Sequence, residues 1–215
     1  MSERTILCFG DSNTHGTIAM RRLDDRRRHS KKNRWPTIMG TALGEGFEII
    51  PEGHPGRTSC FDDPIEGNYK SGARVLPSLL ESHRPLDLVI IMLGTNDLKP
   101  RFHLRAFDIA SGVEKLASMV LTSDSGPDGT APKVLIASPV PIIEAGCLAE
   151  LFAGGAETSR LLSTRLRERA DMLGVGFVDL AEVAEVDPVD GIHLGDDAQA
   201  AIGAAMARAV AGILS

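Results

Sequence analysis

Two short stretches of the sequence hold side chains that together could perform covalent chemistry. GDSN ends an apolar run and contains Ser12, and DGIH, near the end of the chain, contains Asp190 and His193. A serine hydroxyl becomes a nucleophile when a histidine takes its proton, and a carboxylate on the other ring nitrogen fixes the histidine tautomer. Together they would carry out acyl transfer. Taken singly, each stretch has a simpler interpretation, with Ser12 as a helix N-cap and the Asp-x-x-His stretch as a surface turn.

Two further stretches could supply donors to the negative charge that such a reaction creates. In GTND the side-chain amide of Asn96 could donate to an oxyanion. In GHPGRT the backbone N–H of Gly56 could approach a ligand closely, because glycine has no side chain. The Ser12 N–H would be a third donor. The neighbouring aspartates, Asp11 and Asp97, are expected to be structural turn or cap residues.

An alternation of short apolar runs and longer helical patterns predicts the elements that must position these groups. Strands are expected at Thr5–Phe9, Phe47–Ile50, Leu86–Leu93, Val134–Ala137 and Gly176–Val178, and helices at Trp35–Leu43, Asp108–Leu121, Ala156–Leu173 and Asp196–Leu214. This alternation predicts a parallel sheet covered on both faces, a three-layer α/β/α fold. Since the carboxyl ends of parallel strands share one edge, all four stretches would meet in one crevice.

Composition and charge narrow the class of protein. The 215 residues, 43% hydrophobic and 24% charged, suit a single domain over residues 1–215. A net charge of -6 argues against nucleic acid and fits a small neutral ligand. No apolar run approaches the roughly 20 residues of a membrane span, and no signal peptide is evident, which predicts a cytoplasmic protein without a membrane partner. The three cysteines are too few and too dispersed for a disulfide framework or a zinc site.

Three other segments leave alternatives open. The charged run Arg21–Arg34 is predicted to be a solvated loop, with an oligomer contact as the alternative. The apolar, proline-broken segment Pro139–Phe152 could wall an acyl pocket, form a subunit interface or be a buried loop. Asp62 and Asp63 lack metal-ligand spacing, so no metal is expected.

The order of the four stretches resembles the SGNH (GDSL-type) hydrolase superfamily. Its name lists a serine, a glycine, an asparagine and a histidine, which match here as Ser12, Gly56, Asn96 and His193. The stretches ILCFGDS, LDLVIIMLGTND and VDGIHL further resemble the cytoplasmic bacterial arylesterases of this superfamily. Some of those enzymes also act as acyltransferases in water and assemble as multimers.

This resemblance implies a flavodoxin-like fold with a five-stranded parallel sheet of order 2-1-3-4-5. It also implies roles: Ser12 as nucleophile, His193 as general base, Asp190 as its orienting partner, and Ser12, Gly56 and Asn96 as the oxyanion hole. No cofactor is implied. The partners implied are a small-molecule ester and further copies of the chain in a homo-oligomer.

The resemblance leaves the substrate open. Asn13 replaces the leucine of the GDSL spelling, and Asn13, His15 and Ile192 are expected to line the substrate site. The predicted function is a serine esterase of the arylesterase kind that hydrolyses short-chain acyl esters, with acyl transfer to alcohols as a second reaction. The alternatives are a carbohydrate (acetyl) esterase, an enzyme that chiefly transfers acyl groups, and a non-catalytic flavodoxin-like binding module. Because a histidine base must be neutral, activity is expected to fall below a pH of about 6 to 7.

Overall fold

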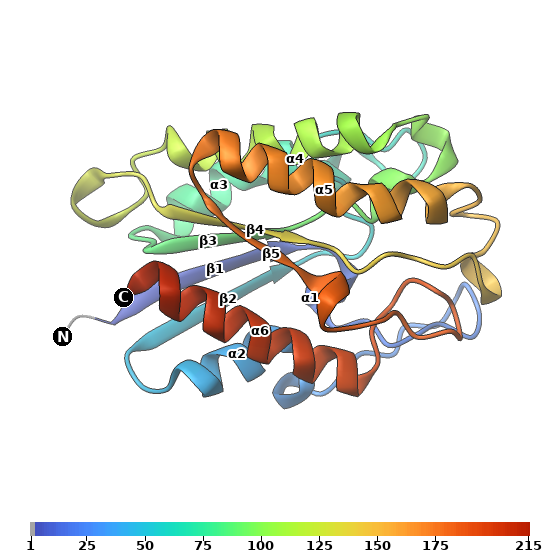
Figure 1. Cartoon of the computed structure of the whole chain (residues 1–215), viewed down its shortest axis with the longest axis horizontal. Helices are drawn as coiled ribbons and strands as arrows, with labels where there is room; N and C mark the ends of the chain where they lie inside the picture. The colour runs from blue at the N-terminus through green and yellow to red at the C-terminus, as the bar shows by residue number, and fades with distance from the viewer. Residues whose placement is uncertain (1–2) are drawn as a thin grey trace.

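Five parallel strands form the centre of the structure, a computed structural model that describes residues 3–215 (Figure 1). The strands are β1 (Arg4–Gly10), β2 (Phe47–Gly53), β3 (Leu88–Met92), β4 (Lys133–Ser138) and β5 (Gly176–Asp179). They lie in the order β2-β1-β3-β4-β5, and every neighbouring pair is parallel. The predicted sheet, strand order and three-layer fold are therefore confirmed.

Helices cover both faces of the sheet. The helices α2 (Trp35–Leu43) and α6 (Asp196–Leu214) pack on one face, and α3 (Gly72–His83), α4 (Ala106–Leu121) and α5 (Gly155–Leu173) pack on the other (Figure 1). The four-residue α1 (Ser12–His15) directly follows β1. Short 3₁₀ helices occupy Lys31–Asn33, Asn68–Lys70, Asn96–Leu98, Pro100–Phe102, Pro127–Gly129, Gly146–Leu148 and Leu180–Glu182. Among residues 3–215, no helix combines the length and apolarity that a membrane crossing requires.

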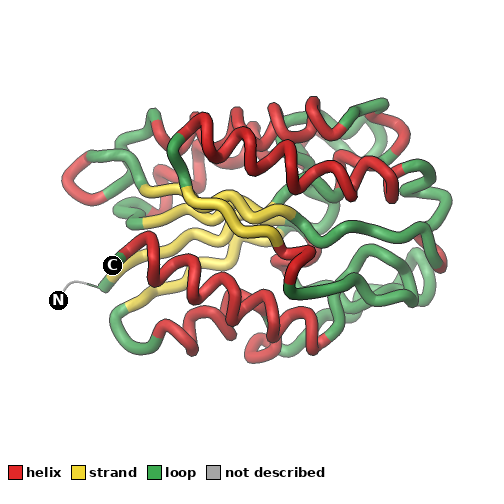
Figure 2. The backbone as a smooth tube through the Cα atoms, viewed as in Figure 1, coloured by secondary structure: helices red, strands yellow, loops and turns green. Residues whose placement is uncertain are grey.

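The alternation of side chains along the strands builds two cores. Ile6 and Cys8 of β1 belong to the core on the α2/α6 side, whereas Leu7 and Phe9 belong to the core under α3, α4 and α5. All five residues of β3 are buried, as expected for a central strand covered on both faces. In the register, Gly10 pairs with both Gly53 and Met92, so the carboxyl ends of β1, β2 and β3 are level. The loops that follow them gather at the end of the sheet opposite the C-terminus (Figure 2).

Two of the differences from the sequence prediction involve a proline. Helix α3 was not predicted, because Pro77 lies inside it and interrupts the helical pattern. Strand β2 continues through Pro51 to Gly53, whereas the prediction ended at Ile50. Proline is tolerated there because β2 is an edge strand, where a missing backbone donor can face away from the sheet.

Candidate active site

Ser12 is the first residue of α1, and only Asp11 separates it from the end of β1. The N-cap of this helix is Asp11, whose Oδ1 accepts a hydrogen bond from the Asn13 backbone N–H at 2.9 Å. The interpretation of Ser12 as a helix cap is therefore wrong, because the preceding aspartate caps the helix. The serine hydroxyl is left available for another partner.

That partner is His193, which lies 181 positions further along the chain. Its Nε2 is 3.1 Å from Ser12 Oγ, and its Nδ1 is 2.6 Å from Asp190 Oδ2. The Asp190 carboxylate favours the tautomer with a proton on Nδ1, which leaves Nε2 free to accept the serine proton. The three residues are 6%, 5% and 0% exposed in the order Ser12, His193, Asp190, and both Ser12 and His193 line a cavity.

The Asp190 carboxylate is held by backbone donors on both oxygens. Oδ1 accepts from the Ile192 and His193 N–H groups at 3.0 Å each, and Oδ2 accepts from the Met20 N–H at 2.6 Å. Burial alone would raise the pKa of Asp190, but its hydrogen bond to the His193 ring, the charge of that ring and the backbone donors outweigh burial and hold the pKa below its usual range. The carboxylate therefore remains ionised beside the imidazole.

The tight turn that joins Asp190 to His193 requires a glycine. Gly191 has a φ of +73°, and a Cβ at this position would lie 2.0 Å from the backbone oxygen of Ile143. Only a residue without a side chain avoids both the left-handed strain and this collision. The turn brings a carboxylate and an imidazole three residues apart into hydrogen-bond contact.

The predicted oxyanion donors lie around the same cavity as Ser12 and His193. Asn96 begins the 3₁₀ helix after β3, and its Nδ2 also donates to Asp11 Oδ2 at 3.4 Å. Within residues 3–215 no hydrogen bond occupies the backbone N–H of Ser12 or of Gly56. These two groups and the Asn96 amide can therefore donate to a bound oxygen.

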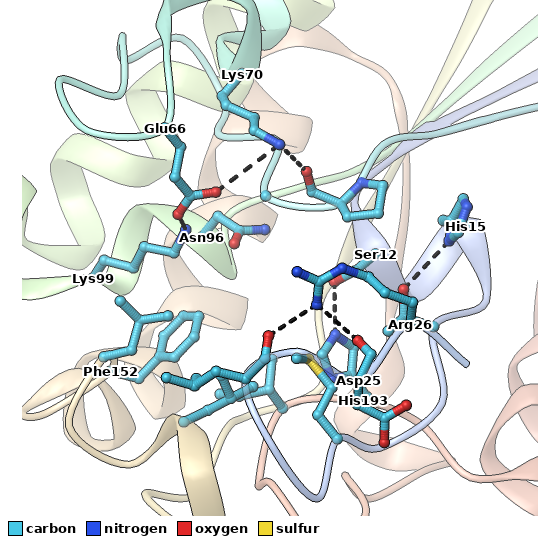
Figure 3. Close-up of a pocket in the computed structure, with 18 of the residues that line it drawn as sticks. Ser12, His15, Asp25, Arg26, Glu66, Lys70, Asn96, Lys99, Phe152 and His193 are labelled. Carbon is cyan, nitrogen blue, oxygen red and sulfur yellow. Dashed lines mark hydrogen bonds and ion pairs between the residues drawn. The ribbon is translucent and has the colours of Figure 1, made fainter. Parts of the chain in front are cut away.

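The cavity has a volume of about 370 Å³ (Figure 3), which suits a small organic molecule. Leu148, Leu151 and Phe152 give it an apolar wall. The end of the segment Pro139–Phe152 therefore borders a pocket, as the first of the three alternatives for this segment predicted. His15 and Ile192 also line the cavity, at the positions predicted for substrate contacts.

Asn13 is placed differently from its predicted role. Its side chain is buried and donates to the Ile192 backbone oxygen at 3.2 Å, and it does not line the cavity with Ser12. The physical reason is the helical turn of α1, which directs neighbouring side chains to different sides. Asn13 ties α1 to the loop that carries His193.

The charged run Arg21–Arg34 is more than the predicted solvated loop. Leu23, Asp25, Arg26 and Arg27 line the cavity and form part of its rim. Met20, just before the run, supplies the N–H that binds Asp190.

Three charged cavity residues outside the run Arg21–Arg34 were missed by the sequence analysis: Glu66, Lys70 and Lys99. Lys99 is 3% exposed, and its Nζ lies 2.6 Å from Glu66 Oε1. Lys70 donates from Nζ to the Pro55 backbone oxygen at 2.7 Å, beside Gly56. The position of Lys99, three residues after Asn96, was a usable signal, whereas Glu66 and Lys70 lie in a loop segment without a recognisable pattern.

The aspartates considered for a metal have other partners. Asp62 pairs with Arg74, and Asp63 accepts from the Ile65 and Glu66 N–H groups and from Arg101. In the part of the chain that the structure describes, no group of three histidine, cysteine, aspartate or glutamate side chains converges as metal ligands would.

An α/β fold with a serine, a histidine and an aspartate in hydrogen-bonded series at the carboxyl edge of its sheet has the layout of an acyl hydrolase. Residues 8–201 match the model of the GDSL-like lipase/acylhydrolase family, and the chain belongs to this family. The resemblance to SGNH hydrolases is thereby confirmed, and the protein is a carboxylic ester hydrolase.

Solved structures of similar proteins agree with this assignment. The carbohydrate acetylesterase Est24 from Sinorhizobium meliloti is 40% identical, with a TM-score of 0.94 over 98% of this chain and 100% of its own. An inhibitor-bound aryl esterase from M. smegmatis is 38% identical, with a TM-score of 0.93 over 97% of this chain and 99% of its own. A comparison with curated protein sequences gave no match.

Proposed function

We propose that the protein is a serine esterase of the arylesterase kind, which hydrolyses short-chain acyl esters through an acyl-Ser12 intermediate. The observation that carries the proposal is the series Ser12 Oγ, His193 Nε2, His193 Nδ1 and Asp190 Oδ2, with contacts of 3.1 and 2.6 Å at one end of a cavity of about 370 Å³. One domain over residues 1–215 would carry the whole reaction.

In the first half of the reaction, Ser12 Oγ attacks the ester carbonyl carbon while His193 Nε2 takes the hydroxyl proton. The carbonyl electrons move to the oxygen, which becomes an oxyanion. The N–H groups of Ser12 and Gly56 and the Asn96 amide donate to it, and losing one such donor typically slows a reaction about 100- to 1000-fold. Asp190 stabilises the imidazolium that forms. The bond to the alcohol then breaks, and the alcohol leaves with the proton from Nε2.

In the second half, water replaces the alcohol. His193 takes a proton from it as its oxygen attacks the acyl carbon, and Ser12 Oγ then leaves and recovers that proton from Nε2. If an alcohol occupies the position of the water, the same steps yield a new ester. We therefore propose acyl transfer to alcohols as a second reaction of the same site.

The apolar wall supports a preference for short acyl chains. Leu148, Leu151, Phe152 and Ile192 border the same cavity as His193, and Phe152 is only 2% exposed. An acyl chain of a few carbons can lie against these side chains and gain from the contact. The similarity to an aryl esterase supports a phenolic leaving group.

A carbohydrate acetylesterase is the second candidate. It is favoured by the 40% identity to the acetylesterase from Sinorhizobium meliloti over 98% of this chain. Such an enzyme would use the same serine and differ only in the alcohol that it accepts. If the protein hydrolyses acetylated sugars faster than aryl acetates at equal concentration, the carbohydrate acetylesterase function is supported over the arylesterase function.

The resemblance to multimeric arylesterases also supports a homo-oligomer in the cytoplasm. Sedimentation analysis of the purified chain against its calculated mass tests the first part of this proposal. A sedimentation mass equal to that of one chain would reject it.

The direct test of the function is release of p-nitrophenol from acetate through octanoate esters by the wild type and by Ser12→Ala. We expect the wild type to cleave the acetate and butyrate esters fastest and Ser12→Ala to lose this activity. The matched control is Ser78→Ala, which removes an exposed hydroxyl on α3 that does not line the cavity. Activity retained by Ser12→Ala would reject Ser12 as the nucleophile.

A further inference from the structure

The charges around the cavity differ in sign from the charge of the whole chain. Four cationic side chains line the cavity, together with two carboxylates, which leaves an excess of two positive charges. The protein as a whole has a net charge of -6. A locally positive cavity attracts anionic molecules and raises their concentration at its mouth.

Three of the four cations lie within ion-pair distance of one of the two carboxylates. Arg27 Nη2 lies 2.7 Å from Asp25 Oδ2, and Lys99 and Lys70 share Glu66, at 2.6 and 3.9 Å. Arg26 is the exception, because within residues 3–215 it forms no ion pair with any carboxylate. Lys70, Lys99 and Arg101 share the carboxylates of Glu66 and Asp63, which leaves one positive charge in that cluster, and Arg26 carries the other. Among the four cavity cations, Arg26 is the one without a carboxylate partner in the described residues.

Two backbone oxygens of the loop that carries Arg26 orient its guanidinium group. Its Nη1 donates to the backbone oxygens of Leu23 and Asp25, both at 2.9 Å. These bonds leave Nε and Nη2 without a partner in the described residues. Figure 3 shows the guanidinium entering the cavity from the side opposite Phe152. The segment is also tied down at its start, because the Met20 N–H donates to Asp190.

We propose that Arg26 is a specificity-determining residue that binds a carboxylate on the alcohol part of the ester, a proposal that rests on the proposed function. The free Nε and Nη2 edge of a guanidinium matches the two oxygens of a carboxylate. The acyl part is assigned to the apolar wall at Phe152, so the charged group falls to the opposite, arginine side. The substrate class is thus an ester of a hydroxy acid or of a carboxylated phenol, in place of the small neutral ligand expected from the net charge.

The test compares two aryl acetates that differ by one carboxylate, phenyl acetate and 4-carboxyphenyl acetate. We expect the wild type to favour the charged ester in kcat/KM, and Arg26→Gln to lower the ratio of the two values about fivefold to tenfold. The matched control is Arg22→Gln, which removes the same charge from an exposed arginine of the same run that is paired with Asp24 and does not line the cavity. The preference should also weaken at high salt, because an exposed charge is screened.

Equal loss of both esters in Arg26→Gln, or an equal change of the ratio in Arg22→Gln, would overturn the assignment. So would a preference for the charged ester that persists in Arg26→Gln.

A binding measurement separates this inference from the proposed function. Titration calorimetry with 4-hydroxybenzoate and phenol needs no turnover, and we expect Arg26→Gln to weaken binding of 4-hydroxybenzoate relative to phenol, whereas Arg22→Gln should not. Absence of ester hydrolysis with this binding pattern intact would reject the esterase function and leave the anion site standing. Normal hydrolysis with no difference in binding would reject the anion site alone.

Discussion

Replacing Asp190 with asparagine tests the central reasoning about the site. The carboxylate accepts four hydrogen bonds, two on Oδ1 from the Ile192 and His193 N–H groups and two on Oδ2 from the Met20 N–H and His193 Nδ1. An asparagine has one oxygen, which can take the place of either Oδ1 or Oδ2 but not of both. Its NH₂ group must then face two donors on the other side.

The geometry of these four bonds gives the size of the effect. The two backbone N–H groups that donate to Oδ1 come from adjacent residues of a tight turn. In the variant they keep the oxygen of the asparagine side chain as their acceptor, so its NH₂ group faces His193. The ring must then present Nδ1 as an acceptor, which places its proton on Nε2, toward Ser12, where it cannot act as a base. Such a tautomer change lowers kcat by about 10⁴-fold in serine hydrolases. The Met20 N–H is left unpaired, at a cost of about 1–3 kcal/mol in the free energy of unfolding.

The assay measures kcat and KM for p-nitrophenyl acetate beside the free energy of unfolding in urea. Asp187→Asn is the matched control, because Asp187 lies in the same loop and its side chain, within residues 3–215, accepts only from the Val189 N–H, a bond that an asparagine oxygen can keep. We expect kcat to fall about 10⁴-fold in Asp190→Asn and to stay near the wild-type value in Asp187→Asn. A folded Asp190→Asn protein with kcat within tenfold of the wild type would refute the reasoning.

Three further outcomes test the surrounding groups. Asn96→Ala removes one oxyanion donor and should lower kcat for p-nitrophenyl acetate about 100- to 1000-fold with little change in KM, and an unchanged kcat would contradict its role. Burial raises the pKa of Asp97 to about 6 from 3.8, even though Ser59 donates to the carboxylate. The folded state therefore binds the proton more tightly, and the resulting stabilisation is complete below about pH 4 and lost as the pH rises through 6. In urea unfolding, Asp97→Asn should gain up to about 3 kcal/mol relative to the wild type between pH 4 and pH 7, and a pH-independent difference would count against this. Phe152→Ala should shift the acyl preference toward hexanoate and octanoate esters, whereas an unshifted chain-length profile would remove Phe152 from the acyl wall.

Local patterns in the sequence were sufficient for most of the fold. The helices at Trp35–Leu43 and Asp196–Leu214 have the predicted bounds, and the continuous apolar run in Leu86–Leu93 contains the buried central strand β3. These elements are predictable because burial on one or both faces imposes a regular spacing of apolar residues, and this spacing is visible in the sequence. Helix α3 was missed because Pro77 breaks that pattern, and the extension of β2 through Pro51 depends on its place at the sheet edge.

The groups proposed for the chemistry were also identifiable from the sequence. Ser12, Asn96, Asp190 and His193 lie in compact stretches at strand ends or before the last helix, and a parallel sheet brings such stretches to one edge. The lining of the cavity was not identifiable in the same way. Asn13 lies next to Ser12 in the chain but turns away from the cavity, whereas Arg26 and Glu66 come from loops distant in the sequence.

The sequence by itself thus determined the alternation of strands and helices and the residue types that the site uses, because periodic burial and short motifs are local properties, whereas the strand order was implied by the family resemblance. Only the tertiary structure decided which side chains line the cavity and which of their charges lie beside a charge of opposite sign. The Lys99–Glu66 ion pair, and the lack of a carboxylate partner for Arg26 within residues 3–215, depend on the paths of loops that connect separate elements. Those paths follow from the packing of the whole chain, and no segment of the sequence specifies them alone.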